Sequence, residues 1–483
     1  MRVTFLTPPS FFHRQPAERS AGCTRVVVPV PNIYLLTLAA TVRRDTGADV
    51  TLCDFTHGGN SPVTRFQHFA NDPGCDFIII WSVNLSLDDD RRALANLRAR
   101  HPAHPVIFAG PGPTYAPQNY LTDPHTFVLR GEPEITACEL INAIAAATPA
   151  EHIKGLSWLD TDGKIHNNPS RPLNDNLDAL PFPARDLIAG RNFHNPKLKT
   201  GPYTTAFTSR NCPYHCIFCV PSSLSFAREI EHRRAHGSGH KPPVRFRSIA
   251  SIDAEMSLIA SQGYRAVGFM DDNFIWDEAR TAAICHVMRR HGLLWGCQAR
   301  ADAITPAIAA MLARSGCRYV DIGVESFDDR ILAYIRKGET AADIRRAVRL
   351  LAESGVSVKL NILIGSSPLE TPRTVANTFR EVRRLPVDQV MINIVSPFPG
   401  TEFHRMCVEN GWLEGGRYVP TDVQRNSILN LPDLSARQME RLLFRHNLRF
   451  FLSPRFIVRQ LGRFRSPAEF AAALHSLKLK LFG

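Results

Sequence analysis

The sequence predicts an α/β protein with two successive parallel-sheet units. The first is a doubly wound open sheet, and the second is a partial (β/α)6 barrel of the TIM type followed by a helical C-terminal region. Short apolar runs alternate with helical patterns over 1–150 and again over 201–400, which is typical of parallel sheets covered by helices. A connector rich in proline and asparagine separates them at 151–200, and the alternation stops in 401–483.

Composition indicates a folded protein of two or three domains. The 483 residues are 44% hydrophobic and 21% charged, as in ordinary globular proteins. No uninterrupted apolar run reaches the roughly 18 residues of a membrane span, and Pro8 and Pro9 interrupt the start where a signal peptide needs a longer apolar stretch. Eleven cysteines with one tight cluster favour reduced thiols and a metal site over a disulfide framework. We therefore expect a cytoplasmic protein.

The excess positive charge is concentrated at the C-terminal end. Formal net charge is +12, and from Arg441 onward seven Arg and two Lys face the single acid Glu469. Charge alone therefore does not imply nucleic-acid binding, and we expect none. Arg441, Arg445 and Arg449 are spaced for one helix face beside leucines and phenylalanines. This pattern fits a solvated helical cap over the barrel, or a contact with a membrane surface or a hydrophobic substrate.

Five strands and three helices are expected in the first unit. The strands are expected at 2–6, 49–55, 76–81, 106–109 and 127–129, and the helices at 32–44, 88–100 and 135–147. Ligands of such sheets bind at the carboxyl ends of the strands. The loops at those ends are rich in Gly, Pro, Ser and Thr, which let a flat, bulky ligand approach the backbone: 7–12, 54–60, 82–87 and 110–114.

Two features of these loops look like ligand sites but have ordinary explanations. The GPGP run from Gly110 to Pro113 lacks the spacing of a phosphate-binding loop. Asp54 and His57 in DFTHGG resemble a metal-ligand pair, but a lone histidine beside two glycines is more often a turn residue.

The second unit follows a hairpin expected at 155–164. Six strands are expected at 204–209, 266–270, 294–299, 319–324, 356–364 and 389–395. The helices between and after them are expected at 252–261, 277–291, 306–315, 329–335, 341–353 and 371–385. Functional residues of such barrels lie at the carboxyl ends of the strands.

The loop after the first barrel strand contains Cys212, Cys216 and Cys219 in a C-x3-C-x2-C array. Three thiolates this close can hold three corners of a 4Fe-4S cluster, leaving one iron open to a ligand that is not protein. A structural zinc site would need His215 as its fourth ligand, and its position next to Cys216 makes that geometry poor. A disulfide with one free thiol is unusual in a reducing compartment. We favour the cluster, with zinc and no metal as alternatives.

With the aromatic Phe218 just before the last cysteine, this array resembles the signature of radical S-adenosylmethionine (SAM) enzymes. In that superfamily the open iron binds the amino and carboxylate groups of SAM, and one electron cleaves SAM to a 5′-deoxyadenosyl radical. The later strand ends are also similar to the family: GFMDDNFIWD, QARAD, GVESFDDRIL, NILIGSSPLET and SPFPGTEF. By position, the resemblance places Phe218, Arg300, Glu325 and Ser326 around SAM. Asp272, in the first of these stretches, fits either a site acid or a helix N-cap.

The first unit resembles the cobalamin-binding domain fused to one branch of these enzymes. The stretches that carry this likeness are PPSFF, NIYLLTLAA, DF, GPGPTY and LRGEPE, upstream of LPFPARDL. The resemblance implies that Gly110, Gly112 and Glu132 lie on the cobalamin side. The D-x-H-x-x-G motif, whose histidine ligates cobalt from below, is absent, because His57 stands one place late and follows the second strand. We expect cobalamin without histidine coordination.

The resemblance implies a cobalamin-dependent radical enzyme that methylates an unactivated carbon of a metabolite, lipid or pigment precursor. Anaerobic oxidative cyclases of tetrapyrrole synthesis share the architecture, and a non-catalytic metal or cobalamin carrier is the alternative from another class. The implied partners are a small-molecule substrate and an electron donor such as flavodoxin or ferredoxin. The Arg- and Phe-rich tail slightly favours a hydrophobic substrate. The basic tail adds the expectation of a peripheral membrane contact.

Overall fold

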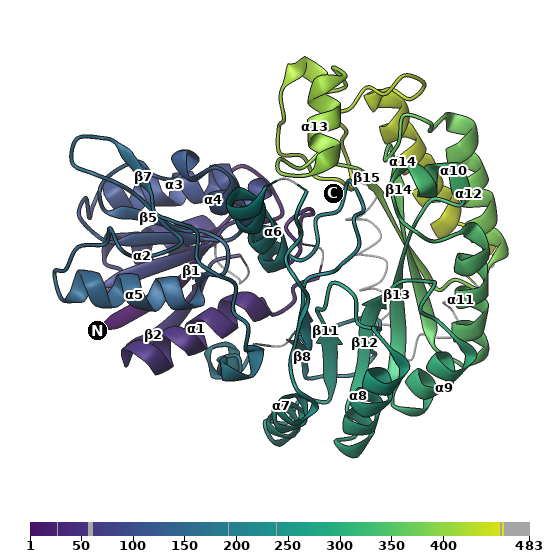
Figure 1. Cartoon of the computed structure of the whole chain (residues 1–483), viewed down its shortest axis with the longest axis horizontal. Coiled ribbons are helices and arrows are strands. Elements are labelled where there is room, and N and C mark those ends of the chain that lie inside the picture. Colours follow the sequence, from purple (N-terminus) through teal and green to yellow (C-terminus); the bar gives the residue numbers. More distant parts are fainter. Residues whose placement is uncertain (27, 57–60, 192, 238, 455, 458–483) are drawn as a thin grey trace.

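Two sheet units lie side by side, and helix α6 (Ser223–His236) lies between them (Figure 1). The computed structural model describes residues 1–457 apart from 27, 57–60, 192, 238 and 455. The chain therefore has the predicted α/β class, with a doubly wound sheet followed by a partial barrel.

The first sheet contains all five predicted strands and the predicted hairpin. Its strands are β1 (Arg2–Thr7), β2 (Asp49–Asp54), β3 (Phe77–Trp81), β4 (Val106–Ala109), β5 (Thr126–Leu129), β6 (Leu156–Leu159) and β7 (Ile165–Asn167). They pair in the order β2-β1-β3-β4-β5-β6-β7, parallel from β2 to β5, whereas β6 and β7 add as an antiparallel hairpin. The strand order reverses between β1 and β3, which is where doubly wound sheets bind ligands.

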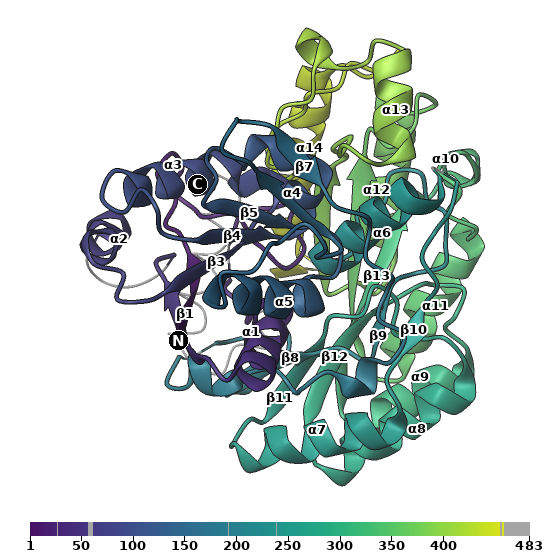
Figure 2. The same cartoon turned by 60° about the vertical axis from the view of Figure 1, so that its left-hand side comes forward.

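Helices cover both faces of this sheet (Figure 2). They are α1 (Ile33–Thr46), α2 (Pro62–Asn71), α3 (Leu87–Arg98), α4 (Pro111–Tyr115) and α5 (Pro133–Ala145), of which the sequence did not predict α2 and α4. Because side chains alternate along a strand, Ile79 and Trp81 of β3 join the core under α1 and α5, while Ile78 and Ile80 join the core under α2 and α3. Burial on both faces explains the uninterrupted FIIIW run.

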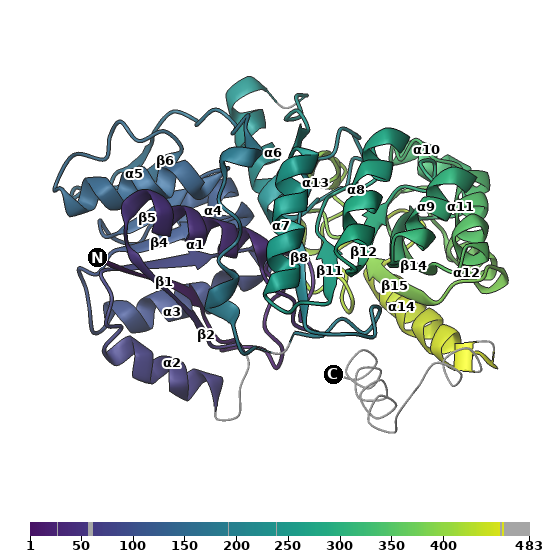
Figure 3. The same cartoon turned by 90° about the horizontal axis from the view of Figure 1, so that it is seen from below.

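The second sheet has six parallel strands in the order β15-β14-β13-β12-β11-β8. They are β8 (Tyr203–Ala206), β11 (Ala266–Phe269), β12 (Leu294–Ala299), β13 (Cys317–Glu325), β14 (Ser357–Ile364) and β15 (Gln389–Ile394). The helices on its outer side are α7 (Ile249–Ser261), α8 (Glu278–Arg290), α9 (Pro306–Arg314), α10 (Asp329–Tyr334), α11 (Ala341–Glu353) and α12 (Pro372–Arg384). Figure 3 shows the strands as an arc inside these helices. Each predicted element of this unit is present.

The interior of this barrel is filled near the amino ends of its strands. Gly268 and Gly296 lack side chains where the rings of Tyr203 and Tyr319 lie against them. Lys197, from the connector, places its Nζ 3.7 Å from the centre of the Tyr319 ring and 2.8 Å from Asp321 Oδ2. A ligand can therefore enter only toward the carboxyl ends, within the part of the barrel that the structure describes.

The C-terminal region contains helices α13 (Glu402–Glu409) and α14 (Ala436–Phe451), joined by an irregular segment. Helix α14 packs beside β15 and α12 (Figure 3). Residues 458–483 of the predicted basic tail lie outside the described residues. None of the described helices is both long enough and apolar enough to cross a bilayer.

Candidate active site

The three cysteines lie in the segment 211–222, the cysteine loop, at the junction of the two units. It runs from β9 (Ser209–Arg210), which pairs with β10 (Arg245–Phe246), to the start of α6. All three thiols are free and half-buried. The loop follows the first barrel strand, as predicted, and is therefore at the open, carboxyl end of the barrel.

Two acids after β11 fasten this loop. The Asp272 carboxylate accepts hydrogen bonds from the backbone N–H groups of Asn211 at 3.1 Å and Ser222 at 2.7 Å, one at each end of the loop. Asp271 accepts from the Thr208 N–H at 3.0 Å, and burial raises the pKa of Asp271 to about 6. The alternative role of Asp272 as a helix N-cap is wrong, because Asp277 caps α8.

Asn211, just before Cys212, has a left-handed backbone with φ of 75°. Its side chain is buried and accepts a hydrogen bond from Arg228. Such a conformation costs a non-glycine residue roughly 1–3 kcal/mol and persists only where its surroundings hold it. The Asp272 hydrogen bond and the Arg228 contact stabilise this backbone conformation of Asn211.

Backbone hydrogen bonds attach the middle of the loop to the barrel. The Ile217 N–H donates to the carbonyl of Ile335 at 3.2 Å, after α10, and the Ile217 carbonyl accepts from the Phe403 N–H at 3.0 Å, in α13. Phe218 packs, partly buried, against the barrel core. The loop is thus tied at both ends and at its centre.

Positively charged side chains surround the cysteine loop. Arg300, directly after β12, stacks its guanidinium 3.6 Å from the centre of the Tyr214 ring and hydrogen-bonds Asp302 at 2.8 Å. Lys241 donates to the carbonyl of Tyr214 at 2.5 Å. Lys337 lies 3.3 Å from Glu325, at the end of β13.

Burial and these cations act in opposite directions on the thiols. Burial raises the pKa of Cys212 to about 11 and also raises the pKa values of Cys216 and Cys219. The positive charge of Lys241 lowers the pKa of each of them, and Lys337 and Arg300 add to this at Cys216. The cations therefore favour the thiolate form that iron ligation requires.

The structure thus brings Arg300 and Glu325, two of the four residues predicted around SAM, into the electrostatic surroundings of Cys216. Phe218 belongs to the loop itself. The hydroxyl of Ser326 instead lies 3.3 Å from that of Thr378 and accepts from the Asp328 N–H. Contacts of these residues with SAM stay a prediction.

The donor set fits an iron–sulfur cluster better than a single metal ion. In the described ranges, no three His, Cys, Asp or Glu side chains gather as one metal ion would require, and His215 is exposed. A cluster spreads its thiolates over separate irons, so they need not converge on one point. The structure therefore gives no support to zinc at His215. Cys212, Cys216 and Cys219 are the residues that would hold the cluster.

The glycines predicted on the cobalamin side are required by the packing of the chain itself. Gly110 has φ of 111°, and a Cβ there would meet the carbonyl oxygen of Ser82. A Cβ on Gly112 would meet the hydroxyl of Tyr120. Their contact with cobalamin stays a prediction. Asp54 pairs with Arg191 at 2.7 Å, and His57 lies outside the described residues.

Glu132 is the centre of a buried ion-pair network between the units. Its Oε1 lies 2.7 Å from Arg210 and 3.0 Å from Arg228, and its Oε2 accepts from the Asn174 N–H at 2.6 Å. Glu134 adds a second contact to Arg210, at 2.6 Å. Arg210 and Arg228 flank the cysteine loop, so the network joins the carboxyl end of β5 to that loop. The cobalamin role predicted for Glu132 stays untested.

Sequence reasoning missed the polar wall inside the barrel. Asn361 on β14 and Asn393 on β15 alternate with aliphatic residues that pack toward the helices, so both face the interior. Their Oδ1 atoms are buried and have no partner among the described residues. Buried polar atoms are normally hydrogen-bonded, which makes this wall a candidate contact for a bound molecule. The signal in the sequence was the polar residues at alternating positions of these strands, Lys359 and Asn361 on β14 and Gln389 and Asn393 on β15.

Fold and site together define an enzyme in which a cysteine loop lies at the mouth of a partial barrel, joined to a doubly wound sheet. Residues 207–382 match the model of the radical SAM superfamily. The chain therefore carries a radical SAM domain over these residues, as the cysteine loop predicts.

Two curated relatives align with much of the chain. An uncharacterized methyltransferase of Pyrococcus horikoshii is 28% identical over 364 residues, which are 74% of each chain. An anaerobic magnesium-protoporphyrin IX monomethyl ester cyclase of Synechocystis is 23% identical over 421 residues, 85% of this chain and 78% of the relative.

Two solved structures share the fold. The cobalamin-dependent SAM radical enzyme OxsB, with aqua-cobalamin and SAM bound, matches with a TM-score of 0.72 at 15% identity, over 100% of this chain and 72% of OxsB. The radical SAM methyltransferase TsrM from Kitasatospora setae, with tryptophan and a SAM analogue bound, matches with a TM-score of 0.63 at 19% identity, over 85% of this chain and 76% of TsrM.

Proposed function

We propose that this chain is a cobalamin-dependent radical SAM methyltransferase that transfers a methyl group to an unactivated carbon of a small molecule. The observation that carries the proposal is the junction of the two units, where Arg210 and Arg228, next to the cysteine loop, pair with Glu132 at the carboxyl end of β5. The cysteine loop thus lies beside the edge of the sheet where doubly wound folds bind ligands, which supports the proposal.

Each cofactor has a candidate place. Cys212, Cys216 and Cys219 would hold the 4Fe-4S cluster, and Arg300 and Glu325, which act electrostatically on Cys216, are the residues that we assign to SAM. When bound, the cluster and SAM supply a carbon-centred radical, and methylcobalamin supplies the methyl group. The cobalamin-containing fold neighbours support a corrin at the first sheet, beside the tightly packed Gly110 and Gly112.

The described barrel supports a substrate site at the same junction. Tyr203, Tyr319 and Lys197 fill the amino end of the interior, so a ligand would have to enter from the carboxyl end, where the cysteine loop lies. There Asn361 and Asn393 offer unpartnered amide oxygens to hydrogen-bond donors of a bound molecule. A substrate that combines such donors with an unactivated carbon fits this wall. We propose a small-molecule partner on these grounds, with a flavodoxin or ferredoxin as the source of the electron.

The test is product analysis with methyl-labelled SAM. The anaerobically reconstituted and reduced enzyme is incubated with cobalamin and candidate substrates, and both 5′-deoxyadenosine and labelled products are measured by mass spectrometry. We expect 5′-deoxyadenosine and a product carrying the label.

The other functions give different results in the same assay. The cyclase relatives, one of which aligns with 85% of this chain, favour oxidative cyclisation as the second candidate, and that reaction gives 5′-deoxyadenosine with an unlabelled product. A carrier gives no 5′-deoxyadenosine although its cluster is intact. Either result contradicts methyl transfer.

A further inference from the structure

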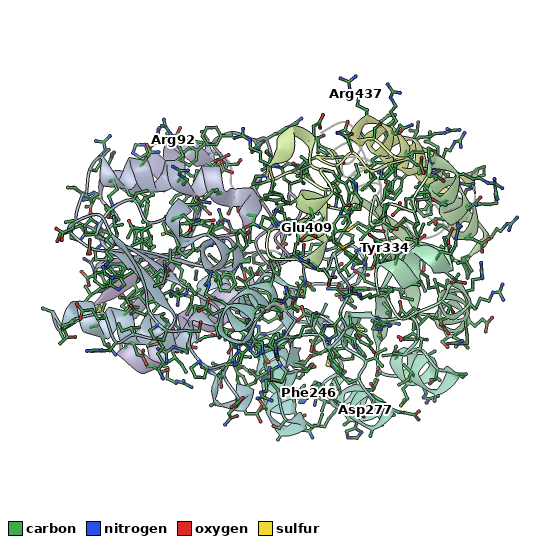
Figure 4. The ribbon with its side chains drawn as sticks, turned by 45° about the horizontal axis from the view of Figure 1, so that its top comes forward. Arg92, Phe246, Asp277, Tyr334, Glu409 and Arg437 are labelled. Atoms are coloured by element: carbon green, nitrogen blue, oxygen red, sulfur yellow. The ribbon has the colours of Figure 1, made fainter. Side chains whose placement is uncertain are left out.

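Helix α14 carries a surface that the proposed methyl transfer does not use. One stripe of the helix is buried against β15 and α12, through Met439, Leu443, His446 and Phe450. The opposite side, which we name the outer face of α14, presents four arginines at intervals of four residues and two exposed apolar side chains, the second on the residue that caps the helix: Arg437, Arg441, Arg445, Arg449, Phe444 and Leu452. Figure 4 shows Arg437 extending away from the molecule.

The four arginines have no anionic partner in the described part of the chain. None of them forms an ion pair or a side-chain hydrogen bond there. In contrast, Arg405 on the neighbouring helix α13 contacts Glu409 at 3.2 Å and Glu402 at 3.9 Å. Like charges four residues apart repel one another along a helix. The arginines on the outer face of α14 therefore repel one another, and an external anion bound there would reduce that repulsion.

The surrounding elements do not neutralise this charge. On α12 the acid Glu381 contacts Arg345 at 2.7 Å and Arg384 at 3.4 Å. On α14 itself, Glu440 accepts a hydrogen bond from the Ser427 N–H. The pKa of the buried His446, on the opposite stripe, is lowered to about 4, first by burial and then by the positive charges of Arg383, Arg449 and Arg445.

The exposed apolar side chains beside the arginines favour one kind of anionic partner over another. Phe444 is 45% exposed and Leu452 is 59% exposed. Nucleic-acid phosphates would pair with the arginines but offer no apolar surface to the exposed parts of these side chains. A phospholipid surface takes both, because cations pair with its head groups while apolar side chains enter the acyl boundary. Long arginine side chains reach the head groups above such a boundary.

We propose that the outer face of α14 binds the surface of an anionic phospholipid membrane, with the helix lying in the plane of the interface. The partner is recognised by its chemistry: closely spaced phosphate or carboxylate head groups over an apolar layer. The proposal does not depend on the reaction of the barrel, so the absence of methyl transfer would leave it standing.

Co-flotation of the full chain with phospholipid vesicles tests the proposal. We expect the protein to float with phosphatidylglycerol-containing vesicles and not with pure phosphatidylcholine vesicles, and to be released as salt rises. Arg441→Glu together with Arg445→Glu should weaken binding by roughly tenfold or more, because each arginine near an anionic surface contributes appreciably. The milder pair Arg441→Gln and Arg445→Gln should give an intermediate loss of vesicle binding. A thermal unfolding measurement checks that both variants are folded.

The matched control reverses two exposed arginines on the first unit, Arg91→Glu and Arg92→Glu on α3; Figure 4 shows Arg92 extending outward there. This variant should bind vesicles as the unchanged protein does. The proposal is overturned if the unchanged protein ignores anionic vesicles at low salt, or if the α14 variants bind as well as the control. Tighter binding to duplex DNA than to vesicles also overturns it.

Discussion

The carboxylate of Asp272 joins the two ends of the cysteine loop. One oxygen accepts the N–H of Ser222 at 2.7 Å and the other accepts the N–H of Asn211 at 3.1 Å, so a single side chain after β11 closes an eleven-residue separation between them. Because a carboxylate has two acceptor oxygens, it can serve both donors at once. We therefore infer that Asp272 holds the two ends of the cysteine loop together and so helps to position its three thiols.

Asp272→Asn should weaken cluster binding. An asparagine offers one acceptor oxygen, so one end of the loop would lose its partner and face an NH2 group instead. Positioning groups behind metal ligands typically contribute about 10- to 100-fold in metal affinity, and we expect a loss toward the lower end. The measurement is iron and sulfide bound per chain after anaerobic reconstitution, together with the electron paramagnetic resonance spectrum of the reduced protein.

Asp277→Asn is the matched control for this experiment. Asp277 caps helix α8 through the Arg280 N–H at 2.7 Å, and asparagine is an equally good N-cap. This variant should bind a full complement of iron. Equal iron content and identical spectra in the two variants would show that Asp272 does not position the thiols.

Replacing any one of Cys212, Cys216 and Cys219 by alanine should abolish the cluster. Two thiolates cannot hold a cluster that already lacks a fourth protein ligand. The loss should appear as missing absorbance near the iron–sulfur band and as failure to form 5′-deoxyadenosine. Cys53→Ser, at a half-buried thiol on β2, is the control and should retain both signals. A variant of the loop that keeps the full absorbance would contradict the ligand assignment.

The barrel and its cysteine loop were predictable because their signals are local. The strand predicted at 294–299 is observed at Leu294–Ala299, and the helix predicted at 341–353 is observed at Ala341–Glu353. In both units, continuous apolar runs coincide with strands that are buried on both faces. The C-x3-C-x2-C array likewise indicates a metal site from residues that lie within a stretch of eight.

Helix α6 was missed because its burial depends on distant charges. Its buried side chains include Arg228, Glu229 and Glu231, which hide the apolar periodicity that predicts a helix. Two of them find partners far away in the chain: Arg228 lies 3.0 Å from Glu132, and Glu231 lies 3.1 Å from Arg130. The same reason explains why the Glu132 network and the Asp272 contacts could not be predicted: nothing near those residues in sequence identifies their partners.

Glu132→Gln should destabilise the chain even without cofactors. It removes the negative charge shared by Arg210 and Arg228, whose side chains are 1% and 0% exposed; Arg210 keeps Glu134, but Arg228 loses its carboxylate partner. Breaking a buried ion pair in this way typically costs about 3–5 kcal/mol, because an uncompensated charge stays buried. Denaturant unfolding of the cofactor-free protein measures this loss of unfolding free energy.

Glu139→Gln, on the same helix α5, is the control for that measurement. Glu139 pairs with Arg171 but is 44% exposed, and such pairs contribute at most about 1 kcal/mol. If Glu132→Gln left the cofactor-free protein as stable as this control, Glu132 would be a cofactor contact and not a structural centre.

Acid should destabilise the packing of α14 through His446. This side chain is 4% exposed, stacks on Phe379 with ring centres 4.0 Å apart, and has a buried Nδ1 without a partner in the described structure. Burial, with the nearby arginines, lowers its pKa from 6.5 to about 4 in the folded chain. Because the folded pKa is the lower one, the contribution of His446 is complete above pH 6.5 and is lost as pH falls toward 4. The loss amounts to roughly 3 kcal/mol at most.

Comparing unfolding free energies at pH 7.5 and about pH 4.5 for the unchanged protein and for His446→Gln isolates this contribution. Glutamine does not titrate, so the variant should be less stable at the higher pH but should lose less stability on acidification. His125→Gln, at an exposed histidine of the first unit, should keep the full acid sensitivity. If His446→Gln lost as much stability in acid as the unchanged protein, the protonation of another group would have to cause that loss. The arginines of α14 would then have no measurable effect on the pKa of His446.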